Sequence, residues 1–98
     1  MTDEELANAV VALGDNILTR DGDTYISAWD FEEMKANVAI RDPLVAMALM
    51  KKLCDEGDTI GIEKQGLYEA DVNQAYFRCN ESPSRAIIEA CVEALTND

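Results

Sequence analysis

The segment 42–57 constrains the fold of this chain more than any other, because the residues at both of its ends mark a helix. Asp42 precedes Pro43, and proline is favoured in the first turn of a helix, where its missing N–H would have no partner in any case. Gly57 is typical of the position after a helix end, since it adopts positive φ at little cost. The sequence therefore predicts a helix that begins at Asp42-Pro43 and ends at Glu56.

Three other helices are predicted from their caps and from apolar residues at helical spacing. Thr2 and Glu5 match a capping box that starts a helix reaching about Ile17. A second helix is expected over about 28–37, followed by a connection over 38–41, and a last helix begins at Ser82. The apolar residues expected to face the core are Leu6, Val10, Leu13, Ile17, Phe31, Met34, Ile87, Ile88, Cys91, Val92 and Leu95.

Two β-prone segments, 59–62 and 75–79, lie between the last two helices, and the polar stretch 63–74 is expected to be a loop between them. A shorter β-prone piece covers 24–26. Because 98 residues is a typical length for one domain, we predict a single domain over 1–98. Its predicted class is α+β, mainly helical, with four helices and a small antiparallel β-hairpin.

This order of elements resembles a winged helix-turn-helix domain over about residues 6–80. In that family the matching positions of the third helix face the core, a glycine ends this recognition helix, and a wing follows. The resemblance implies a winged-helix-like fold, whose members bind either DNA or proteins. The positions that carry it are Ile26, Ser27, Ala46, Met50, Leu53, Gly57 and Ile60.

The surfaces that would read DNA in such a domain have the wrong chemistry here. DNA-reading members carry polar or basic side chains on the outward face of the third helix and basic residues in the wing. The outward positions here are Leu44, Val45, Met47, Ala48 and Lys51, and the wing has Glu63, Glu69 and Asp71 against Lys64. The apolar helix face is either buried under the last helix or exposed as a protein or homodimer interface, which makes Val45 and Met47 candidate partner contacts.

The net charge of the chain is −12, from 8 basic and 20 acidic residues. Such a field repels nucleic acids and anionic membranes, which bind proteins chiefly through Lys and Arg, and it attracts basic protein surfaces. The same acidity also favours solubility, which is an alternative explanation for it. We therefore expect a protein partner with a basic surface, no direct nucleic acid and no membrane.

The chain lacks the residues that several kinds of catalytic or metal site require. Without histidine there is no Ser–His or Cys–His pair, and no glycine-rich phosphate loop occurs. Cys54, Cys79 and Cys91 form no CxxC pair, so a zinc site would need carboxylates. We expect no enzyme activity, no cofactor and no metal, with Cys54 and Cys91 as reduced core thiols. The N-terminus lacks signal-peptide features and no apolar run is long enough to span a membrane, so we expect a cytoplasmic protein.

The segment from Asp21 to Phe31 resembles a degenerate EF-hand loop. Its first ligand position holds Thr19, its turn glycine is replaced by Thr24, and its bidentate glutamate is replaced by the shorter Asp30. These departures favour a polar turn before a capped helix over a calcium site.

The function favoured by these observations is that of a non-enzymatic, acidic protein-binding module, an inhibitor or regulator. In size and charge it is similar to phage-encoded inhibitors such as anti-CRISPR proteins and DNA mimics, which act in the host cell cytoplasm. The candidate partner contacts are Asp55, Glu56, Asp58, Glu63, Glu69 and Asp71, with Tyr68 as an aromatic anchor. One alternative is a dimeric winged-helix transcription regulator with Arg41, Lys51, Lys52 and Lys64 on phosphates. The other is a structural or assembly component that uses the apolar face of the third helix.

Overall fold

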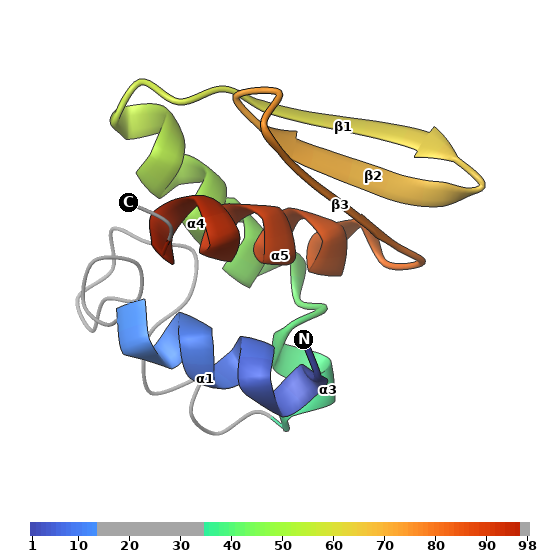
Figure 1. Ribbon diagram of the computed structural model, residues 1–98. Coiled ribbons are helices and arrows are strands. Elements are labelled where there is room, and N and C mark those ends of the chain that lie inside the picture. The colour runs from blue at the N-terminus through green and yellow to red at the C-terminus, as the bar shows by residue number, and fades with distance from the viewer. Residues whose placement is uncertain (14–34, 97–98) are drawn as a thin grey trace.

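The computed structural model describes residues 1–13 and 35–96 of the chain and confirms the α+β class (Figure 1). Its elements are α1 (Asp3–Leu13), α3 (Ala36–Ala39), α4 (Pro43–Asp55), β1 (Ile60–Gln65), β2 (Leu67–Val72), β3 (Tyr76–Asn80) and α5 (Pro83–Thr96). The end of the predicted first helix, most of the predicted second helix, the β-prone piece at 24–26 and the EF-hand-like segment lie outside the described residues.

The predicted caps start three of the helices, and in α5 the Ser82 Oγ accepts from the Arg85 N–H at 3.3 Å. Thr2 Oγ1 accepts a hydrogen bond from the Glu5 N–H at 3.2 Å, which begins α1. Asp42 accepts from the Leu44 N–H at 2.8 Å and begins α4, which ends just before Gly57 at a φ of 95°. The carbonyl and side-chain oxygens that cap each helix satisfy N–H groups without an intrahelical partner.

The prediction of one helix through 28–37 followed by a connection is wrong in its last part. Lys35 is extended, with φ −68° and ψ 145°, and its carbonyl accepts from the Val38 and Ala39 N–H groups, so a new short helix, α3, starts after it. Ala39 and Ile40 are buried in the core, and their packing holds this turn in place. The boundary therefore depends on tertiary contacts that local propensity does not reveal.

The prediction of a long loop over 63–74 is also wrong. β1 continues to Gln65, the chain turns at Gly66 with a φ of 82°, and β2 returns alongside it. The three strands form an antiparallel sheet in the order β1-β2-β3. Only one face of β2 is apolar. Its other face carries acidic residues, so the sequence of this segment is polar on average and was predicted to be a loop.

Helix α5 is the central element of the molecule. It packs against β2 and β3 on one side and against α4 and α1 on the other (Figure 1). The largest fully buried side chains of the described residues come from α5 itself and from the elements on both sides of it, and they are Leu6, Val10, Ile40, Val45, Leu49, Val72, Ile88, Cys91 and Val92. The sheet is thus covered by α5 on one face, while no described helix packs on the other face.

Candidate functional site

The face of the sheet that points away from α5 gathers three of the predicted carboxylates. Ala70 and Val72 of β2 are fully buried, so the alternating residues Glu69 and Asp71 point to the opposite side. In the strand register Glu63 lies opposite Glu69, and Asp71 lies opposite Phe77. We call this surface the outer sheet face, and it consists of Gly61, Glu63, Gln65, Leu67, Glu69, Asp71, Phe77 and Cys79.

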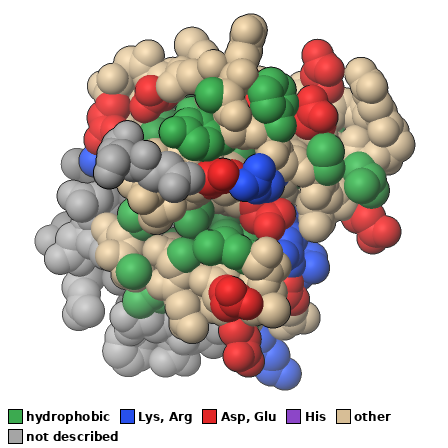
Figure 2. Space-filling view, viewed as in Figure 1, with side chains coloured by type: hydrophobic (Ala, Val, Ile, Leu, Met, Phe, Trp, Pro, Cys, Tyr) green, Lys and Arg blue, Asp and Glu red, His purple; other side chains and the backbone are tan. Residues whose placement is uncertain are grey.

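The outer sheet face carries negative charge that no described cation pairs with. Among the described residues, no ion pair of the structure involves Glu63, Glu69 or Asp71. Most cations are held elsewhere: Arg41 and Arg85 against Asp3, Lys51 against Asp55, Lys52 against Glu56, Arg78 against Glu93, and Lys64 over the Tyr68 ring. Figure 2 shows acidic side chains at the sheet end and at the α1 end of the molecule, with Lys and Arg side chains interspersed between them.

Glu63 and Glu69 are like charges on directly paired positions of neighbouring strands. Such a pair is destabilising, by an amount on the order of 0.2–1 kcal/mol. Glu69 Oε2 accepts a hydrogen bond from the Cys79 thiol at 3.7 Å. Partial desolvation, together with the charge and hydrogen bond of Glu69, raises the pKa of the exposed Cys79 above its ordinary value of 9.0, which favours the neutral thiol.

Asp71 leans across the sheet toward β1 because Gly61, its partner there, has no side chain. A Cβ atom at Gly61 would lie 2.6 Å from Asp71 Oδ1. The other oxygen, Oδ2, accepts the Gln74 N–H at 3.0 Å and so fixes the carboxylate. The Glu63 carboxylate and the Oδ1 atom of Asp71 are therefore two negative groups that both lie near strand β1.

The other predicted carboxylates lie where α4 ends, off the outer sheet face. Asp55 pairs with Lys51 at 2.5 Å and Glu56 pairs with Lys52 at 2.6 Å, both one helical turn apart. Asp58 accepts a hydrogen bond from Asn73 Nδ2 at 2.8 Å, which ties the α4–β1 connection to the β2–β3 turn. The six predicted carboxylates thus form two separate groups, and the Asp55, Glu56 and Asp58 group already has partners within the chain.

Tyr68 lies on the covered face of the sheet, away from the three carboxylates. It is partly buried against the core, and Lys64 Nζ stands 5.1 Å from the centre of its ring. The exposed aromatic residue of the outer sheet face is Phe77, which is 47% exposed and is not among the partner contacts predicted from the sequence. The alternation of β3, with Tyr76 and Arg78 on the covered face, is the signal that would have found it.

The apolar face of α4 is only partly open. Val45 is fully buried and Ala48 is 3% exposed, so the expectation that Val45 contacts a partner is wrong, because its side chain belongs to the core. Leu44 and Met47 remain 44% and 42% exposed. The described part of α4 thus offers a partner two neighbouring side chains.

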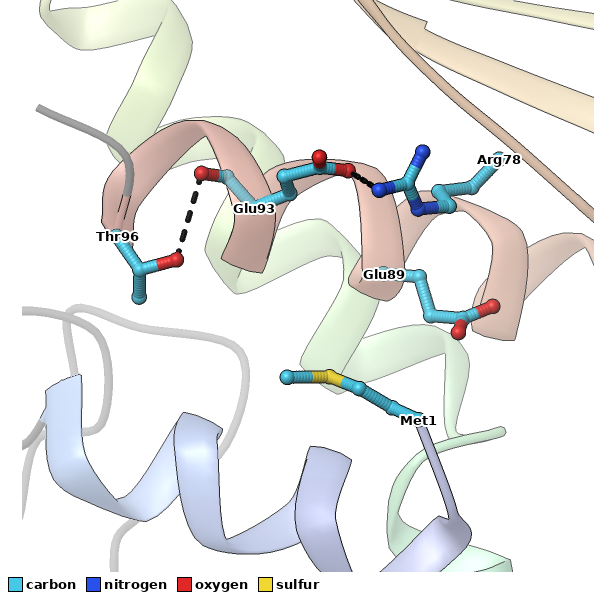
Figure 3. Close-up of a pocket in the computed structure, with 5 residues that line it drawn as sticks. All are labelled: Met1, Arg78, Glu89, Glu93 and Thr96. Carbon is cyan, nitrogen blue, oxygen red and sulfur yellow. Dashed lines mark hydrogen bonds and ion pairs between the residues drawn. The ribbon is translucent and has the colours of Figure 1, made fainter.

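The depression in Figure 3 is lined by Met1 ahead of α1, Arg78 of β3, and Glu89, Glu93 and Thr96 of α5, and its charged side chains have partners within the chain. Arg78, on the covered face of the sheet, pairs with Glu93 of α5, and Arg85 Nε lies 3.7 Å from Glu89. Thr96 Oγ1 donates to the Val92 carbonyl at 2.8 Å. The Arg78–Glu93 pair joins the sheet to α5, and the other two contacts lie within the helix.

The three cysteines differ in exposure. Cys91 is buried, and burial raises its pKa to about 12, whereas Cys54 is exposed, so the prediction of a core position is right for Cys91 and wrong for Cys54. Within residues 1–13 and 35–96, no group of three or more His, Cys, Asp or Glu side chains could hold a metal ion.

No protein-family model, curated protein or solved structure matches this chain, so the winged-helix and EF-hand resemblances stay predictions. In the part of the chain that the structure describes, no helix is long and apolar enough to cross a membrane.

Proposed function

We propose that this chain is a non-enzymatic protein-binding module, an inhibitor or regulator, that docks its outer sheet face on a basic protein surface in the cytoplasm. A groove that normally holds nucleic acid is the kind of surface that fits, since carboxylates can occupy the places of phosphates. Phage-encoded inhibitors and DNA mimics act in this manner. The aromatic anchor of this interface is Phe77, in place of Tyr68.

The observation that carries the proposal is the gathering of Glu63, Glu69 and Asp71 on one face, where no cation of residues 1–13 and 35–96 pairs with them. Repulsion between paired glutamates costs the free protein stability. A Lys or Arg of a partner placed between them would remove that cost and add a charge-assisted hydrogen bond. Leu67 and Phe77, both nearly half exposed, supply apolar area beside these charges.

The cations needed for the DNA-binding alternative are engaged within the chain. Arg41 donates to the Asn37 carbonyl at 2.8 Å and pairs with Asp3, and Lys52 pairs with Glu56. Contact with phosphates would require these side chains to leave their partners. This arrangement supports a protein partner over a nucleic acid.

The test is a titration of the ¹⁵N-labelled protein with a ten-residue oligolysine peptide at low salt, followed by amide chemical shifts. The largest shifts are expected on β1, β2 and β3 around Glu63 and Glu69. The double variant Glu63→Gln/Glu69→Gln should bind the peptide about tenfold more weakly, because two charges at the contact are lost.

The matched control removes the same amount of charge from the end of α4, as Asp55→Asn/Glu56→Gln. It should change the affinity by less than about twofold, because these carboxylates already have lysine partners. Equal weakening in both double variants would show that the peptide senses only the overall charge, and the docking proposal would then be wrong. The same pair of variants distinguishes specific from non-specific proteins when partners are captured from a host lysate.

A further inference from the structure

Strand β1 is an edge of the sheet. Of the described residues, only those of β2 pair with it, so one side of its backbone has N–H and C=O groups without a strand partner. Such an edge can accept an added strand through main-chain hydrogen bonds. We propose that the partner docks by adding an extended basic segment to β1 as a further strand. This mode of docking would bring the basic segment of the partner next to the outer sheet face.

The covered face of β1 offers an apolar contact to such a segment. Helix α5 packs against β2 and β3, and Ile62 of β1 is left 45% exposed. Ile62 and Glu63 follow each other in the strand and so point to opposite faces. A segment beside β1 would therefore meet an apolar side chain on one face and a carboxylate on the other.

The charges near this edge define the spacing of the cations in the partner. Glu63 points out on the outer face, and two residues earlier Gly61 leaves room for Asp71 Oδ1, which lies over it. Two basic residues of an added strand, at positions i and i+2, would face these two carboxylates. The residue between them would face Ile62, so the motif is basic-apolar-basic.

A second copy of this chain is a less suitable occupant of the edge. Pairing β1 with β1 of another copy would bring further glutamates onto the same face, and each chain carries a net charge of −12. Like charges on directly paired strand positions are destabilising. Charge complementarity thus selects a basic segment.

The probe is a capped peptide, Thr-Lys-Val-Lys-Val-Thr, added to the intact ¹⁵N-labelled protein at millimolar concentration and low salt. Its control has the same side chains with every backbone amide methylated, so that it keeps the charge and cannot donate main-chain hydrogen bonds. We expect the unmethylated peptide to slow amide exchange within β1 by at least about tenfold and to bind about tenfold more tightly than its methylated form.

A variant of the protein tests the same contact from the other side. Ile62→Lys places a cation on the edge and should weaken the unmethylated peptide by about tenfold, while Val38→Lys on α3, at a residue 52% exposed, should leave its affinity unchanged. Both side chains are exposed, so neither change should unfold the protein.

The inference rests on the proposed function, but the two fail differently. Equal binding of both peptides, with shifts around Glu63 and Glu69 and no protection of β1 amides, would overturn strand addition and leave docking on the acidic face intact. If neither peptide binds, strand addition is also overturned. If oligolysine binds the Glu63→Gln/Glu69→Gln variant as tightly as the wild type, the proposed function itself is overturned.

Discussion

The helices and the outer sheet face of this molecule hold their charges differently. Most carboxylates of the described helices lie against cations, as in Lys52 with Glu56 at 2.6 Å and Arg85 with Asp3. On the outer sheet face Glu63 faces Glu69 and no described cation is in range. Among the described residues, negative charge is therefore mostly paired on the helices and left without an ion pair at Glu63, Glu69 and Asp71. A surface where charge is kept without compensation is where a partner has most to contribute.

The largest effect is expected where a helix cation is buried. The Arg85 side chain is 9% exposed, lies against Asp3 and donates to the Met1 carbonyl at 2.7 Å, so it joins the start of α1 to α5. Arg85→Met should lower the free energy of unfolding by about 2–3 kcal/mol, because Asp3 loses its least exposed partner. Urea unfolding measures this, with Lys52→Met as the matched control, expected within about 0.5 kcal/mol of the wild type. A loss as small as that of the control would remove the distinction between buried and exposed helix pairs.

The same network makes stability depend on pH. Burial raises the pKa of Asp3, but the hydrogen bonds and charges of Arg41 and Arg85 outweigh it, so this pKa lies below its ordinary 3.8. A carboxyl group with a lower pKa in the folded protein stabilises it above the unfolded pKa, and this is lost as the pH falls through the folded pKa. The difference in unfolding free energy between wild type and Asp3→Asn should be complete above about pH 5 and shrink below pH 3.8. Urea titrations from pH 7 to pH 3 check this, and a constant difference would contradict it.

Neutralising one glutamate in each region should change stability in opposite directions. Glu63→Gln removes a repulsive strand pair and should raise the free energy of unfolding by up to about 1 kcal/mol. Glu56→Gln removes an attractive helix pair and should lower it by about 0.3–0.5 kcal/mol. Parallel urea curves of the two variants measure the difference. If both changes stabilise the protein, the acidic residues act through total charge and the two regions are not distinct.

The starts of α1, α4 and α5 could be predicted from the sequence because their signals are local, unlike the start of α3. Asp42, Gly57 and Ser82 mark ends that the structure retains, and the pairs of Lys51 with Asp55 and Lys52 with Glu56 follow from a spacing of four residues. The pair of Arg85 with Asp3 joins residues 82 positions apart, and no local pattern indicates it.

The sheet and the site were harder to predict, because the face of each strand residue depends on register. The turn at Gly66 decides that Tyr68 is covered and that Glu69 is not. In a polar stretch the apolar alternation of β2 is short, so the strand resembled a loop. The charge of Glu63, Glu69 and Asp71 makes them candidate partner contacts in the sequence, but only the pairing of the strands brings them onto one face.

The smallest predicted effect concerns the thiol that reports on the outer sheet face. Partial desolvation and the neighbouring Glu69 raise the pKa of Cys79, which lowers the fraction of reactive thiolate. Glu69→Gln removes the part due to charge and should speed alkylation of Cys79 by iodoacetamide at pH 8 by about two- to threefold. The rate at Cys54, which is exposed on α4, should not change, and buried Cys91 should stay unreactive in the folded protein. An unchanged rate at Cys79 would mean that Glu69 imposes no local field on this face, and the contrast with the helices would then rest on Glu63 and Asp71 alone.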